Sequence, residues 1–135
     1  MDHIERLVPR LVFDSFRDPL PVGIRSGEPI VRQVLYEAGP YSIDLRFDHD
    51  RGSRRVWLTG QIASDQPDRH VDRLTVWVTA GAQPAAQACT NNHGEFQLDY
   101  EPHPELQLHI GVQPREQIEL PLEASAGAST TEDER

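Results

Sequence analysis

A chain of 135 residues is long enough for one domain with a substantial core and short for two. Its formal net charge of −9 argues against duplex nucleic acid or an anionic membrane surface as the main partner, because both attract basic proteins. No window approaches the roughly 20 apolar residues that a membrane span needs. Met1 to Arg6 lack a basic region followed by an apolar run, so we expect no signal peptide and a cytoplasmic protein.

Two residue types limit the chemistry further. All thirteen cationic residues are Arg, and the absence of Lys excludes a Schiff base, a lysine nucleophile and a Lys–Asn cross-link. The single cysteine, Cys89, excludes an internal disulfide and with it the disulfide-stapled class of small secreted domain. Because Cys89 lies in a run of alanines, we interpret it as a small buried apolar residue.

Residues 1–32 are predicted to form an N-terminal arm. Residues 1–10 are compatible with a short helical turn that Pro9 would end. Leu11 to Phe16 has strand-like composition, and the Pro- and Gly-rich stretch after it cannot continue a helix or a central strand. Two interpretations of Leu11 to Phe16 stay open: an edge strand of the same domain, or a docking peptide. The docking hypothesis rests on a surplus of apolar side chains, namely Val12, Phe13, Phe16, Leu20 and Ile24.

From residue 33 to residue 122 the apolar residues recur with the period of two that is typical of β-strands. The first strand is Val34 to Tyr36, and the others are indicated by alternating apolar residues. These are Tyr41, Ile43, Leu45 and Phe47; Val56, Leu58 and Ile62; Leu74, Val76 and Val78; Phe96, Leu98 and Tyr100; Leu106, Leu108, Ile110 and Val112; and Ile118, Leu120 and Leu122.

The most informative stretch is Thr90 to Leu98, which reads as a strand end, a tight turn and a new strand. We expect the turn to centre on Asn92 and Gly94, because Asn and Gly tolerate positive φ. Before it, Ala85 to Thr90 is a weak strand of small residues, expected either at a sheet edge or against a bulky neighbour. Residues 123–135 are predicted to be a disordered acidic tail.

Short strands at turn spacings of roughly 8 to 12 residues, with no convincing helix, predict an all-β fold. We expect residues 33–122 to form an antiparallel β-sandwich of seven to eight strands, with the arm preceding it and the tail following it.

Three segments carry a family resemblance: Val56 to Ile62, Leu74 to Val78 and Thr90 to Leu98. Their order, a strand with a Gly, a Val-x-Val strand and then Thr followed by Gly-Glu-Phe-x-Leu, resembles the carboxypeptidase regulatory-like domain. The resemblance covers about residues 54–122. It implies a transthyretin-like, prealbumin-type sandwich and a non-catalytic module of the kind attached to enzymes, receptors or surface proteins.

A second resemblance spans Leu11 to Ser15, Arg32 to Tyr36 and Ile43 to Arg46. These segments are similar to small bacterial proteins associated with extracytoplasmic-function (ECF) sigma factors and with caspase-like CHAT peptidases. That resemblance implies an accessory, regulatory partner in a bacterial signalling or defence system.

The sequence shows no catalytic or metal-binding pattern, and we expect no enzyme activity, cofactor or metal. Hydroxyisourate hydrolases share the transthyretin fold but require a C-terminal Tyr-Arg-Gly-Ser, whereas this chain ends in Thr131 to Arg135. The six histidines lack the spacing of a zinc site, and the acidic residues lack a calcium-loop pattern. No Ser occupies a Gly-x-Ser-x-Gly elbow.

Trp57 and Trp77 fall on the phase opposite their apolar neighbours, which predicts that both lie on the outer face of the sheet. The alternative is that both are covered, either by the other sheet, if the phase of one strand is inverted, or by the arm, in which case Phe13 and Phe16 are the expected partners. Our leading hypothesis is a protein-binding module that uses Val12, Phe13, Phe16, Leu20, Trp57 and Trp77. The alternative function is a carbohydrate-binding module that uses an exposed Trp pair.

Overall fold

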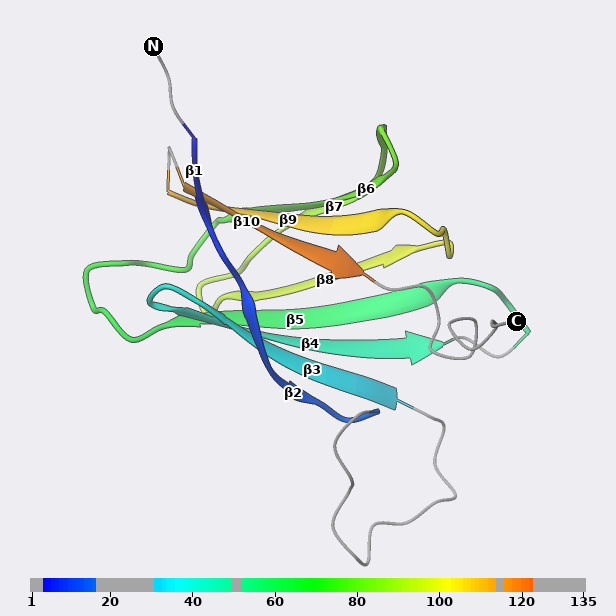
Figure 1. The fold of residues 1–135 in the computed structure, drawn as a ribbon, viewed down its shortest axis with the longest axis horizontal. Coiled ribbons are helices and arrows are strands. Elements are labelled where there is room, and N and C mark those ends of the chain that lie inside the picture. Colours follow the sequence, from blue (N-terminus) through cyan, green and yellow to red (C-terminus); the bar gives the residue numbers. More distant parts are fainter. Residues whose placement is uncertain (1–3, 17–30, 50–51, 114–115, 123–135) are drawn as a thin grey trace, which may run out of the picture.

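The computed structural model describes residues 4–16, 31–49, 52–113 and 116–122, and these residues contain ten strands and no helix (Figure 1). The strands are β1 (Glu5–Leu7), β2 (Arg10–Asp14), β3 (Val31–Ala38), β4 (Tyr41–His49), β5 (Val56–Ser64), β6 (Thr75–Ala80), β7 (Gln83–Cys89), β8 (Glu95–Tyr100), β9 (Leu106–Gln113) and β10 (Glu116–Leu122).

The strands form two five-stranded sheets that pack as a β-sandwich. Sheet A has the order β1-β10-β9-β6-β7, and sheet B has the order β2-β3-β4-β5-β8. All neighbouring strands run antiparallel except β1 and β10, which are parallel. The predicted all-β sandwich is confirmed, with ten strands where the sequence predicted seven to eight. The two additional strands, β1 and β2, come from the N-terminal segment.

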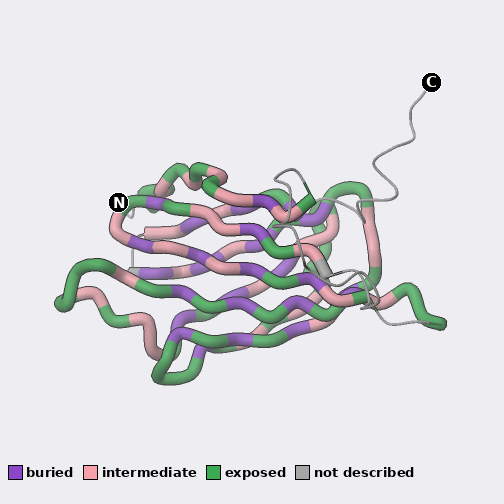
Figure 2. Tube along the Cα trace, turned by 90° about the horizontal axis from the view of Figure 1, so that it is seen from below, coloured by how far each residue is buried: buried purple, intermediate pink, exposed green. Residues whose placement is uncertain are grey.

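Alternating side chains from both sheets build one apolar core. Along β5 the buried Val56, Leu58 and Ile62 alternate with exposed residues, as the period of two predicted. Figure 2 shows the same alternation of buried and more exposed residues along the other central strands. Residues on the outer phase of each sheet therefore face solvent, and the surfaces available to a ligand consist of them and of the sandwich edges.

The N-terminal segment supplies an edge strand to each sheet. β1 pairs with β10 in sheet A, the chain then passes through Val8 and Pro9, and β2 pairs with β3 in sheet B (Figure 1). Pro9 has no N–H to donate to a ladder, so the change of sheet falls where pairing is weakest. The predicted helical turn is wrong for Glu5–Leu7, and the edge-strand interpretation describes Arg10–Asp14. The rest of the predicted arm, residues 17–30, and the predicted tail lie outside the described residues.

The turn between β7 and β8 lies at the predicted position, but Asn91 takes the structural role that was expected of Asn92. Gly94 adopts φ +78°, whereas Asn92 keeps a negative φ. Asn91 stabilises the turn: its side-chain oxygen accepts hydrogen bonds from the backbone N–H groups of His93 and Glu95, both at 2.9 Å. Asn91 thereby closes the turn from inside.

Candidate interaction surfaces

Large exposed apolar side chains gather on the N-terminal segment. Among the described residues the exposed large apolar side chains are Ile4, Val8, Val12, Phe16 and Trp57, and four of these five belong to residues 4–16, which we call the N-terminal edge. Val8 is the most exposed of them, at 82%. Leu7 and Leu11 of the same segment pack against the core instead. The N-terminal edge therefore holds the sandwich with some side chains and offers others to solvent.

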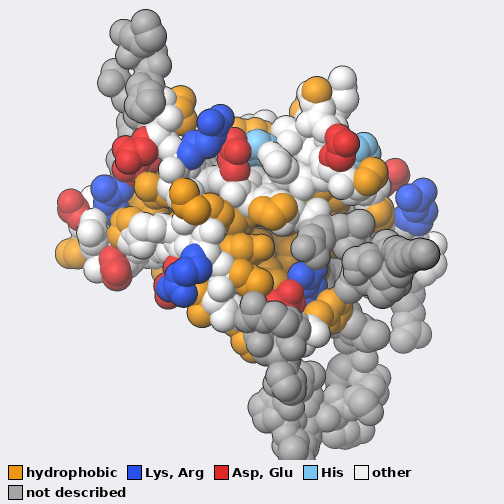
Figure 3. Space-filling view, in the orientation of Figure 1, with side chains coloured by type: hydrophobic (Ala, Val, Ile, Leu, Met, Phe, Trp, Pro, Cys, Tyr) orange, Lys and Arg blue, Asp and Glu red, His pale blue; other side chains and the backbone are white. Residues whose placement is uncertain are grey.

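The backbone of the N-terminal edge is also partly free. β1 lies at the end of sheet A and β2 at the end of sheet B, so among the described strands each has a ladder neighbour on one side only. Figure 3 shows hydrophobic side chains extending across this face of the molecule, between the two sheets. An extended segment from another molecule would find here both unpaired backbone groups and apolar side chains.

An ion pair anchors the C-terminal end of the N-terminal edge. Arg32 on β3 donates two hydrogen bonds to the carboxylate of Asp14, from Nε at 3.1 Å and from Nη2 at 2.7 Å. The Arg32 guanidinium also lies 5.5 Å from the ring centre of Phe16 and 5.9 Å from that of Phe47. These contacts hold β2 and Phe16 against the end of the core. Burial raises the pKa of the nearby Tyr100 phenol above its ordinary value, and the charge of Arg32 opposes that rise.

The two tryptophans lie on outer faces, as their phase predicted, but on different sheets. Trp57 belongs to β5 in sheet B and is 39% exposed, whereas Trp77 belongs to β6 in sheet A and is half-buried. Because outer faces of a sandwich point in opposite directions, the expected Trp pair does not exist as one surface. Phe16, one of the two residues predicted as an alternative cover for the tryptophans, lies against Arg32. Leu20, the remaining predicted contact residue, lies outside the described residues.

Trp77 is part of a polar cluster on the outer face of sheet A. Its ring stacks on His109, with 5.0 Å between the ring centres and 7° between the planes. His109 Nε2 lies 3.0 Å from Thr79 Oγ1, and its Nδ1 lies 3.4 Å from a carboxylate oxygen of Glu119. Carboxylate, imidazole and hydroxyl thus follow one another as in a nucleophilic triad. Thr79 lies in mid-sheet between Gln107 and Pro84, and we interpret the cluster as a cross-strand structural network.

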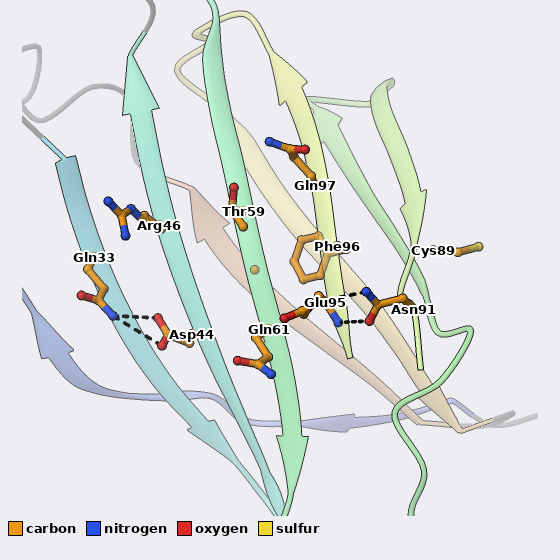
Figure 4. Close-up of a pocket in the computed structure, with 11 residues that line it drawn as sticks. Gln33, Asp44, Arg46, Thr59, Gln61, Cys89, Asn91, Glu95, Phe96 and Gln97 are labelled. Atoms are coloured by element: carbon orange, nitrogen blue, oxygen red, sulfur yellow. Dashed lines mark hydrogen bonds between the residues drawn. The ribbon is translucent and has the colours of Figure 1, made fainter. Parts of the chain in front are cut away.

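The outer face of sheet B carries a polar hollow with a volume of about 580 Å³ (Figure 4). We call it the sheet B hollow. Its lining comes from β3, β4, β5 and β8 and from the end of β7, and consists of Gln33, Asp44, Arg46, Thr59, Gly60, Gln61, Cys89, Asn91, Glu95, Phe96 and Gln97. The sequence placed Asp44 and Arg46 on the outer phase of their strand. It gave no sign of the hollow, which depends on the pairing of distant strands.

Cys89 lies exposed at the end of β7, next to the sheet B hollow. The expectation of a buried cysteine is therefore wrong. The reason is that β7 is an edge strand of sheet A and is mostly exposed along its length. Small residues on this strand are therefore no sign of a buried position.

Two structural features that bear on function are absent from the described residues. They contain no group of three or more His, Cys, Asp or Glu side chains placed to hold a metal ion. In the same part of the chain there is no helix of the length and apolarity needed to cross a membrane.

No protein-family model matches the chain, and neither the curated proteins nor the solved structures compared with it give a match.

Proposed function

We propose that the protein is a non-enzymatic, protein-binding regulatory module and that the N-terminal edge is its docking surface. The observation that carries the proposal is the concentration of exposed apolar side chains on residues 4–16, beside strand edges that have no ladder neighbour. Contiguous apolar surface on an otherwise polar protein favours a partner, and free strand edges favour strand addition as the binding mode.

The contacts that fix the N-terminal edge to the sandwich support a preformed docking surface. The ion pair between Asp14 and Arg32 holds the end of β2, and Leu7 and Leu11 anchor it to the core. A partner that binds such a surface spends little free energy on ordering it, which favours affinity.

The proposal includes the two resemblances. A prealbumin-like sandwich of the carboxypeptidase regulatory-like type would serve as a rigid carrier for the docking surface. The likeness to small bacterial proteins associated with sigma factors and CHAT peptidases points to a cytoplasmic signalling or peptidase component as the partner.

Cross-linking in the native host, followed by quantitative mass spectrometry, tests the docking surface. We expect the double variant Val8→Asp/Val12→Asp to lose at least about tenfold of a specific cross-linked partner, because charge on an apolar contact costs affinity. Both side chains are solvent-exposed, so the fold should tolerate the change.

Trp57→Asp is the matched control, because it places the same charge at the remaining large exposed apolar side chain, away from the N-terminal edge. It should retain the partner. An identical set of partners in the wild type and in the double variant, with thermal unfolding unchanged, would refute the N-terminal edge as the docking surface.

A further inference from the structure

The sheet B hollow is built from two rows of side chains that run across the sheet. One row consists of Asp44, Gln61 and Glu95, and the next of Arg46, Thr59 and Gln97, in register on β4, β5 and β8. Residues two apart on a strand face the same side, so both rows point outward together (Figure 4). The result is a grid of hydrogen-bonding groups around a common hollow.

Half of this grid is fixed by its own hydrogen bonds. Gln33 Nε2 donates to both oxygens of Asp44, at 3.1 and 3.4 Å, and Asn91 Nδ2 donates to Glu95 Oε1 at 3.0 Å. Gln61 Nε2 donates to the carbonyl of His93 at 3.3 Å. These bonds orient the carboxylates at the margins of the hollow before any ligand arrives.

The other half has no such bond. Among the described residues, the side chains of Arg46, Thr59 and Gln97 have no hydrogen-bond or ion-pair partner, although all three line the hollow. A guanidinium, a hydroxyl and an amide together offer many donors and several acceptors. They form the part of the hollow that is free to bond a ligand.

The charges of the hollow favour a neutral ligand. The two carboxylates, Asp44 and Glu95, outnumber the one guanidinium and disfavour an anion. Both carboxylates already accept hydrogen bonds from Gln33 and Asn91, and the part of the hollow without such bonds carries Arg46, which disfavours a cation there. Hydroxyl groups of a sugar both donate and accept, which is the pattern that mixed amide, carboxylate and guanidinium side chains satisfy. A volume of about 580 Å³ lies within the usual range for small-molecule sites.

An exposed aromatic ring flanks the hollow on the same face. Trp57 precedes Thr59 by two residues on β5, which places it about 7 Å further along the strand. In register it lies between Asp48 and Asp99, in the row next to that of Arg46, Thr59 and Gln97. Its flat face is suited to stack against the C–H face of a sugar ring.

We propose that the sheet B hollow binds a neutral oligosaccharide, with Trp57 stacking on one sugar ring and Arg46, Thr59 and Gln97 hydrogen-bonding the adjacent sugar. The site uses Trp57 without Trp77. Trp57, Thr59 and Gln97 lie on β5 and β8, at the opposite end of sheet B from β2, whereas the margin of the hollow at Gln33 borders the N-terminal edge through its backbone hydrogen bond with Ser15. Variants at Trp57, Thr59 and Gln97 therefore test the hollow without altering the N-terminal edge.

The single cysteine provides a direct readout. A polarity-sensitive dye on Cys89, at the rim of the hollow, is titrated with hexasaccharides of β-1,4-glucose, β-1,4-xylose, β-1,4-mannose, α-1,4-glucose and β-1,4-N-acetylglucosamine. We expect a saturable signal with at least one of them, confirmed by calorimetry on the unlabelled protein. Arg46→Ala and Trp57→Ala should each weaken binding at least about tenfold.

Trp77→Phe is the control, because it alters an aromatic residue on the outer face of the other sheet and should leave the affinity unchanged. No response to any hexasaccharide at about 10 mM, well above the weakest affinities of interest, would overturn the proposal. Equal affinities in wild type, Arg46→Ala and Trp57→Ala would also overturn it. Saturable binding of a Ser- and Asn-rich peptide, or of the anionic polysaccharide dextran sulfate, without binding of any neutral hexasaccharide would overturn the proposal and assign the hollow to a different ligand class.

Discussion

Gly94 holds the turn before β8 in a left-handed conformation, with φ +78°, which non-glycine residues adopt only with strain. It is also packed from outside: a Cβ atom there would lie 2.1 Å from the backbone oxygen of Ile62. Gly52 has the same φ but no atom within 4 Å of such a Cβ. A side chain at Gly52 would therefore meet backbone strain alone, whereas a side chain at Gly94 would meet both backbone strain and a steric clash.

Replacing each glycine by Ala should give different losses of stability. We expect Gly52→Ala to lower the free energy of unfolding by about 1 kcal/mol through backbone strain alone. Gly94→Ala should lower it by at least about 3 kcal/mol, because overpacking adds to the strain. Urea denaturation of both variants checks this difference. Equal losses of unfolding free energy in the two variants would show that the backbone at Ile62 can move away from the new Cβ atom at little cost.

Tyr100 is a buried phenol, and burial is the main reason that its pKa is raised. Because the folded-state pKa lies above the unfolded value of about 10, the unfolded chain loses this proton first as pH rises. The corresponding stability is fully present below pH about 10 and is lost above it.

Alkaline denaturation of Tyr100→Phe tests this linkage. Between pH about 9 and about 11.5, the free energy of unfolding should fall less steeply in the variant than in the wild type, by up to about 1.4 kcal/mol per pH unit. Urea unfolding at several pH values measures the slope. Parallel slopes would mean that Tyr100 titrates alike in the folded and unfolded chains.

At the scale of elements, β5 and β8 show how a glycine shapes a strand pair. Gly60 lies opposite Phe96 in the ladder, and a Cβ atom on Gly60 would lie 2.3 Å from the Phe96 ring. The ring therefore occupies the space that a side chain on Gly60 would take. This contact keeps β8 closely packed on β5 and supports the floor of the sheet B hollow, which both residues line.

In the described part of the chain, two ion pairs connect β2 to β3, and they differ in burial: Arg32–Asp14 is largely buried, whereas Arg10–Glu37 is exposed. The side chains of Arg32 and Asp14 are only 15% and 10% exposed, whereas those of Arg10 and Glu37, which pair on the same two strands, are well exposed. Removing Asp14 takes two charge-assisted hydrogen bonds away from a largely buried guanidinium, while an exposed pair contributes little.

Asp14→Ala should therefore lower the free energy of unfolding by about 2 kcal/mol, and Glu37→Ala by no more than about 0.5 kcal/mol. Hydrogen exchange should show faster exchange of the β2 amides in Asp14→Ala, with β4 and β5 less affected. If β2 exchanges equally in both variants, the ion pair does not hold the N-terminal edge in place.

For the whole molecule, the decisive feature is that the first described residues complete both sheets. β1 is parallel to β10, the last strand, so segments more than a hundred residues apart lie side by side. The two sheets are thus connected at one edge by a segment that also carries most of the exposed large apolar side chains of the described residues. Stability and the proposed protein binding share that segment, whereas Trp57, Thr59 and Gln97, which are proposed to bind sugar, lie on β5 and β8 at the other end of sheet B.

The strand character, the inward residues and the turn at Gly94 could be predicted from the amino-acid sequence, because period-two alternation and glycine conformation are local properties. Strand phase also placed Trp57 and Trp77 outward correctly. Which strands are neighbours became known from the folded structure alone. It separated the two tryptophans, exposed Cys89 on an edge strand, and brought Arg46, Thr59 and Gln97 into one row. Phase along a strand says which face a side chain takes, whereas pairing between distant strands is set by packing of the whole chain.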